Sequence, residues 1–146
     1  MKKVNIGCGE DFSEDLIGID MYDYGQQHIL DVEKDPLPFD DDSIDKILAN
    51  HSVEHFRDCQ FIFNEAWRVL RKGGEFEIKV PNFMWQGAHK PVHFQHCTLS
   101  WFDWFRRPKT KVYGYQPWEI RVLEMRNFTS DVPEGKEIYC VLSPKK

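Results

Sequence analysis

The most constraining feature of this chain is a glycine turn between two short apolar segments near its start. Residues 4–9 read VNIGCG and residues 16–20 read LIGID. Both segments are typical of buried strands, and the second ends in a carboxylate. In parallel α/β sheets, ligands collect at the carboxyl ends of strands, where glycines let the backbone approach a ligand and an acid can bind ribose hydroxyls. The pattern therefore predicts a nucleotide-type site.

Length and composition favour one globular domain over residues 1–146. The chain has 146 residues, of which 41% are hydrophobic and 29% charged, which allows a substantial core but leaves no room for a second domain. The net charge of -5 argues against general binding to polyanions, so neither nucleic acid nor a membrane surface is an expected partner. Because we find neither a long apolar run nor a signal-peptide pattern, we expect a cytoplasmic protein.

The cysteines show no disulfide or metal-binding pattern. Cys8, Cys59, Cys97 and Cys140 lack any CxxC spacing, which favours separate, buried, reduced thiols.

Histidines before Cys97 suggest only a weak metal hypothesis. His89, His93 and His96 lie close together in the sequence, but no acidic or CxxC partner completes a tetrahedral set. We therefore expect no metal.

Hydrophobic patterning predicts seven strands and two helices. The expected strands cover residues 3–7, 16–20, 28–31, 44–50, 75–80, 118–126 and 137–142. A helix is expected over residues 56–71, with Gly73 and Gly74 as its stop, and a second over residues 99–106. The buried face of the first helix is expected to contain Phe61, Ile62, Ala66, Val69 and Leu70.

Six motifs follow one another across nearly the whole chain. They are VNIGCG at 4–9, GID at 18–20, LDV at 30–32, LPFDDDSID at 37–45, EH at 54–55 and EAWRVLRKGG at 65–74. Their order resembles the class I S-adenosylmethionine-dependent methyltransferases, in which the fourth and sixth motifs flank the fourth strand and precede the fifth. The resemblance implies an α/β, Rossmann-like fold with a seven-stranded, mostly parallel sheet.

The same resemblance implies a site for S-adenosylmethionine, with S-adenosylhomocysteine as its product. Gly7, Cys8 and Gly9 would lie against the methionine part, and Asp20 would accept hydrogen bonds from the ribose hydroxyls. The remaining implied contacts are Met21 on the adenine, Asp31 at the adenine amino group, Asn50 and His51 along the methionine arm, and Asn5 and Val32 within the same site.

The spacing of the first strands departs from that family. Eight residues separate the first two expected strands and seven separate the next two, whereas a helical crossover needs a dozen or more. Glu10 and Asp11 also replace the helix opening that usually follows the glycine turn. Right-handed crossovers would put all the missing helices on one sheet face, and the alternating polar residues Glu75, Glu77 and Lys79 agree with this. We predict two layers, with one sheet face solvated or covered by a partner chain or a second copy.

The expected reaction is methyl transfer to an oxygen or nitrogen of a small-molecule or sugar-like acceptor. Displacement at a sulfonium is in-line, so much of its catalysis can come from holding donor and acceptor in near-attack geometry. If the acceptor must lose a proton, a histidine is the natural base, and His51 is the best placed. A packing role for His51 is an equal alternative.

Three other functions remain open. A degenerate relative could serve as a binding or assembly module, and it would then fail to bind S-adenosylmethionine. Residues 101–111 join aromatic and basic side chains, as an RNA-directed methyltransferase could, although a core helix followed by a solvated turn is the preferred interpretation. An NAD-linked Rossmann enzyme is least favoured, because the GxGxxG helix opening is absent.

Overall fold

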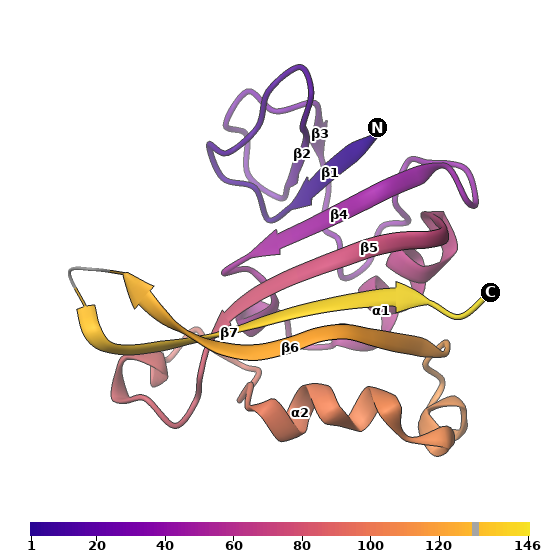
Figure 1. Ribbon diagram of the computed structural model, residues 1–146. Helices are drawn as coiled ribbons and strands as arrows, with labels where there is room; N and C mark the ends of the chain where they lie inside the picture. Colours follow the sequence, from indigo (N-terminus) through magenta and orange to yellow (C-terminus); the bar gives the residue numbers. More distant parts are fainter. Residues whose placement is uncertain (130–131) are drawn as a thin grey trace.

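A seven-stranded sheet in the order β3-β2-β1-β4-β5-β7-β6 forms the centre of the computed structural model (Figure 1). The structure describes residues 1–129 and 132–146. The strands are β1 (Lys3–Ile6), β2 (Ile17–Asp20), β3 (His28–Ile29), β4 (Ile44–Asn50), β5 (Leu70–Pro81), β6 (Trp118–Thr129) and β7 (Val132–Pro144). β7 is antiparallel to both of its neighbours, β5 and β6. Each neighbouring pair among the first five strands is parallel. This confirms the expected Rossmann-like, mostly parallel sheet.

The helices of the described residues all lie in two connections, from β4 to β5 and from β5 to β6. They are η1 (Val53–His55), α1 (Cys59–Val69), η2 (Gln86–Ala88), α2 (Leu99–Asp103), η3 (Trp104–Arg106) and η4 (Pro108–Tyr113), where η marks a 3-10 helix. Across the described ranges, no helix has the length and apolarity that crossing a bilayer requires.

The hydrophobic core lies between the sheet and α1, on the face where α1 and α2 pack (Figure 1). Phe76 and Ile78 of β5 point to this face, and Ile62, Phe63 and Ala66 of α1 cover them; all five side chains are fully buried. The four cysteines are free and buried, as their spacing predicted.

The predicted limits of the first helix were wrong. α1 begins at Cys59, where the side chain of Asp58 caps it by accepting from the Gln60 N–H at 2.8 Å. It ends at Val69, and the chain passes directly into β5. The predicted glycine stop therefore lies inside β5, where Gly73 has a φ of +78°.

The predicted buried face of that helix needs two corrections. Leu70 is buried but is the first residue of β5. Phe61 is 36% exposed, whereas Phe63 is fully buried and stacks on Phe105 with ring centroids 5.1 Å apart. Phe105 comes from η3, so helical periodicity alone could not reveal this contact. The strand limits also shift: β3 is shorter than expected, and β5, β6 and β7 are longer.

The opposite face of the sheet carries no helix within the described residues, as predicted. Lys46 of β4 lies between Glu75 and Glu77 of β5, with Nζ to Oε2 distances of 3.5 and 2.6 Å. The guanidinium of Arg126 lies over the ring of Tyr139, 3.4 Å from its centroid. Because these charges are balanced across the strands, the face is suited to water. Coverage by a partner chain stays a prediction.

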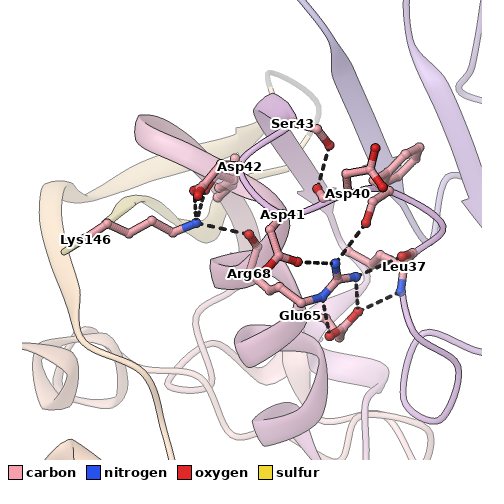
Figure 2. Close-up of polar contacts among 10 residues, drawn as sticks. Leu37, Asp40, Asp41, Asp42, Ser43, Glu65, Arg68 and Lys146 are labelled. Atoms are coloured by element: carbon pink, nitrogen blue, oxygen red, sulfur yellow. Dashed lines mark hydrogen bonds and ion pairs between the residues drawn. The ribbon is translucent and has the colours of Figure 1, made fainter.

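Arg68 of α1 joins two of the sequence motifs (Figure 2). Its guanidinium donates to the carboxylates of Glu65 and Asp41 and to the carbonyls of Leu37 and Phe39, at 2.7–3.0 Å. Glu65 also accepts from the Leu37 N–H at 2.9 Å, and its hydrogen bond with Arg68 holds its pKa below the usual value. The acidic loop before β4 is thereby fixed against α1.

Replacing Arg68 by alanine should lower the free energy of unfolding by about 2–3 kcal/mol, because Glu65 and two loop carbonyls lose their donor. Arg106→Ala is the matched control: Arg106 also pairs with an acid three residues earlier, Asp103, but both side chains are exposed. Its loss should cost less than about 1 kcal/mol. Urea unfolding measures both values, and equal losses would contradict the anchoring role of Arg68.

Candidate functional site

The glycine turn after β1 is held in a left-handed conformation. Gly7 and Gly9 have φ values of +63° and +52°. A Cβ on Gly7 would lie 2.5 Å from the Cβ of Ser52, so the turn packs directly on the segment after β4. The carboxylate of Asp20, at the end of β2, locks the turn by accepting from the N–H groups of Gly9 at 3.0 Å and Tyr22 at 3.1 Å.

A cavity of about 110 Å³ lies beside this turn, and we call it the turn cavity. Its lining consists of Gly7, Asp20, Met21, Leu30, Asp31, Val32, Glu33, His55 and Phe56. Five of the residues predicted to bind the cofactor are brought together here: Gly7, Asp20, Met21, Asp31 and Val32. The sequence reasoning missed the other four; the EH motif at 54–55 was the available signal for His55 and Phe56.

Asp31 is an ionised acceptor at the edge of the turn cavity. Its carboxylate accepts from the Lys34 Nζ at 2.6 Å and from the Glu33 N–H at 3.1 Å. The hydrogen bond from Lys34 holds the pKa of Asp31 below its usual value. Since the Lys34 side chain is 78% exposed, it can move aside for a ligand.

Other predicted residues lie outside the turn cavity. Asn5 and Asn50 line a separate cavity of about 170 Å³ on the open sheet face, where the Asn5 side chain donates to the Asp11 carbonyl at 2.9 Å. Burial raises the pKa of the Cys8 thiol to about 11, and the sulfur lies against Gly18. Asn5 and Cys8 therefore have packing roles, and a contact of Asn5, Cys8 or Asn50 with a cofactor stays a prediction.

A second cavity, of about 340 Å³, adjoins the turn cavity, since His55 lines both. We call it the histidine cavity. Its lining consists of His51, Glu54, His55, Pro81, Trp85, Gly87, Lys90 and His93. The two cavities thus share one side chain.

His51 lies between two carboxylates at the end of β4. Its Nε2 is 2.8 Å from an oxygen of Glu137, and its Nδ1 is 3.5 Å from an oxygen of Glu54. Burial opposes the charged form, but the two carboxylates together outweigh it and raise the pKa of His51. With a φ of +54°, His51 also has a strained backbone of the kind that gathers at functional sites.

His55 and His93 face each other with perpendicular rings, 4.8 Å between centroids. The Nδ1 of His55 bonds to the Val92 carbonyl at 3.1 Å, and that of His93 bonds to the Ala88 carbonyl at 2.8 Å. Because a carbonyl can only accept, each Nδ1 carries a hydrogen, and in the neutral imidazole the lone pair is therefore on Nε2. Burial lowers the pKa of His93, which favours this neutral form.

The preferred interpretation of residues 101–111, a core helix followed by a solvated turn, holds in part. The helix predicted over residues 99–106 is divided into α2 and the 3-10 helix η3, and the expected turn is the 3-10 helix η4. Phe102 and Phe105 are buried in the core, and Trp101 and Trp104 are partly buried against it. Both tryptophans border a further cavity of about 440 Å³.

Replacing Gly7 by alanine should cost more stability than replacing Gly9. Both variants would hold a Cβ in the left-handed region, which costs about 1–2 kcal/mol. Only the Cβ at Gly7 meets Ser52 at 2.5 Å, while nothing lies within 4 Å of a Cβ at Gly9. This overlap should add about 1–3 kcal/mol in urea unfolding. Equal destabilisation would show that the turn does not pack tightly on Ser52.

Comparison with known proteins identifies the family of the chain. A family model described as a methyltransferase domain matches residues 4–78, from β1 into β5. A protein of Mycolicibacterium smegmatis, described as a probable S-adenosylmethionine-dependent methyltransferase, is 31% identical over 93 residues, which are 52% of this chain and 36% of the relative. The match thus spans about a third of that relative's length.

Solved structures show the same fold. An S-adenosylmethionine-dependent methyltransferase from Mesorhizobium loti has a TM-score of 0.67 at 13% identity, covering 97% of this chain and 90% of its own. A Haloferax volcanii protein, solved in complex with the Trm112 methyltransferase activator, has a TM-score of 0.65 at 18% identity. The similarity covers 99% of this chain and 82% of the Haloferax volcanii chain. The chain therefore belongs to the class I S-adenosylmethionine-dependent methyltransferases.

Proposed function

We propose that this chain transfers the methyl group of S-adenosylmethionine to an oxygen or nitrogen of a small, polar acceptor. The observation that carries the proposal is the pair of adjoining cavities, which share His55. The adenosine half of the donor would lie at the turn cavity, whose volume of about 110 Å³ holds only part of the cofactor, and the acceptor would lie in the histidine cavity. Their contact would bring the reacting groups together, which is the main requirement of an in-line displacement.

The residues of the turn cavity fit the adenosine half of the cofactor. Each carboxylate oxygen of Asp20 accepts one backbone hydrogen bond and keeps capacity to accept from a ribose hydroxyl. Asp31 can accept from the adenine amino group, and the exposed Met21 can lie against the base. When bound, the cofactor supplies an electrophilic methyl group; the chain's task is to hold and orient it.

The histidine cavity suits a small acceptor. Its volume of about 340 Å³ is at the lower end of small-molecule sites, which span about 300–1,000 Å³. Lys90 and the imidazoles favour polar or anionic groups, and Trp85 adds a flat apolar surface. A nucleic acid duplex or a folded protein would not enter a cavity of this size.

We assign proton removal from the acceptor to His51, which lines this cavity. Of its two carboxylate contacts, the one with Glu54 is the longer, at 3.5 Å, and an acceptor hydroxyl could replace it at Nδ1. Glu137, 2.8 Å from Nε2, would then orient the ring and stabilise its charged form.

The proposal extends to location and partners. We place the protein in the cytoplasm, and we propose the open sheet face as the surface for a partner chain or a second copy. The complex of the Haloferax volcanii protein with Trm112 supports considering a protein partner.

Asp20→Ala should weaken binding of S-adenosylhomocysteine at least about 100-fold, because the ribose loses its charged acceptor and the turn loses its lock. Asp23→Ala is the matched control: Asp23 also accepts a backbone N–H, that of Gly25 at 2.9 Å, but it does not line the turn cavity. Calorimetric titration measures both variants, and circular dichroism checks the fold. Unchanged affinity in Asp20→Ala would refute the site, and a wild-type chain that fails to bind would favour the non-catalytic module.

His51→Asn tests the assignment of the base. Asparagine tolerates the left-handed backbone at this position but cannot accept the proton. Transfer of a radiolabelled methyl group, first screened over a panel of small hydroxyl and amine acceptors, should slow about 100-fold in kcat. Affinity for S-adenosylhomocysteine should stay within about threefold, because His51 does not line the turn cavity. An unaltered kcat would assign His51 to packing.

A further inference from the structure

Three metal-ligating side chains converge in the lining of the histidine cavity. One ligand atom of each of Glu54, His55 and His93 lies within 4.8 Å of those of the other two. Glu54 and His55 belong to η1, whereas His93 lies in the segment after η2. The fold thus assembles a cluster that is absent from any short stretch of the sequence.

Glu54 supplies a buried oxygen that lacks a partner. The residue is 2% exposed, and its Oε1 lies 3.5 Å from the Nδ1 of His51. Its Oε2 has no hydrogen-bond donor among the described residues. Leaving a buried polar atom unsatisfied costs about 1–3 kcal/mol, and more when it is charged. A cation bound at Oε2 would remove that cost.

Each of the two histidines makes the outer hydrogen bond that is usual for metal ligands. Each donates its Nδ1 hydrogen to a backbone carbonyl, that of Val92 for His55 and that of Ala88 for His93. In metal sites such an outer hydrogen bond fixes the ring and directs the lone pair of the other nitrogen to the ion. His55 is also exposed, which gives an ion a route from solvent.

We propose that Glu54, His55 and His93 bind one divalent transition-metal ion, with zinc as the best match. Two imidazoles and one carboxylate form the ligand set of catalytic zinc sites, which leave a position open for water or substrate. Zinc ligands at about 2.0–2.1 Å from the ion are about 3.3 Å apart, so the side chains would close by no more than about 1.5 Å.

This site differs from the histidine group considered from sequence. His89 bonds through Nε2 to the Phe83 carbonyl at 2.7 Å, and His96 stacks on the ring of Phe83. Of that group, only His93 joins the cluster. The partners of His93 are instead Glu54 and His55, the two residues of the EH motif.

The consequence for chemistry rests on the proposed function. A metal ion with an open position in the histidine cavity would bind the acceptor oxygen and make its hydroxyl more acidic. Lys90 lines the same cavity, and its positive charge weakens cation binding. We therefore expect a dissociation constant of micromolar order.

The test is zinc binding by the full chain, after treatment with a chelator, in competition with a chromophoric indicator. One ion per chain is expected. His93→Ala should weaken binding at least about tenfold, whereas His96→Ala, in the same segment but outside the cluster, should not change it. Cobalt added in place of zinc should give visible absorption bands in the wild type that His93→Ala lacks.

Absence of saturable binding, or equal losses in the two histidine variants, would overturn the site. His55→Ala provides a second loss variant at an exposed position, should His93→Ala fail to fold. Calorimetry with S-adenosylhomocysteine on the chelator-treated chain separates the two proposals. Cofactor binding without zinc binding would refute the metal site alone, and zinc binding without cofactor binding would refute the proposed function alone.

Discussion

The hydrogen bonds from the N–H groups of Gly9 and Tyr22 to the carboxylate of Asp20 hold together the part of the molecule on which the site depends. Within the described residues, no helix lies between β1 and β2, so the glycine turn does not have the support that a following helix would give it. The carboxylate replaces that support by linking the ends of β1 and β2. The same carboxylate lines the turn cavity, so one side chain both stabilises the turn and belongs to the proposed site.

A second constraint acts at the amino ends of β4 and β5. Arg68 ties the acidic loop before β4 to α1, and that loop leads into the strand whose end carries His51. Two of the most specific motifs of the sequence are therefore structural, since they meet at this guanidinium rather than at a ligand. Their spacing reflects the need to position β4 beside β1.

The two-layer arrangement follows from the short connections between the first strands. With eight and seven residues available between the expected strands, a crossover helix cannot form, and one sheet face is left uncovered. Side chains on that face are polar and form cross-strand ion pairs, such as that of Lys46 with Glu77. A polar, self-neutralised surface can face water without the penalty that an apolar sheet would pay.

Local patterns predicted the strands, their open face and five residues that line the turn cavity, because alternation and glycine turns are properties of neighbouring residues. Helix limits and core partners were less accessible, as Phe63 shows: its burial depends on stacking with Phe105 from a distant segment. The surroundings of Asn5 and Cys8 were inaccessible for a similar reason, since they come from the returning loop and from Gly18.

The sequence by itself determined the family, the sheet and the carboxylates that follow β2 and β3, since these depend on short motifs in a fixed order. Only the tertiary structure decided which side chains the histidines meet. Glu54 and His55 meet His93 because the long β5 and the segment after it return the chain to η1, and Glu137 reaches His51 because β7 pairs with β5. Such meetings depend on the paths of whole strands and loops, which no local pattern specifies.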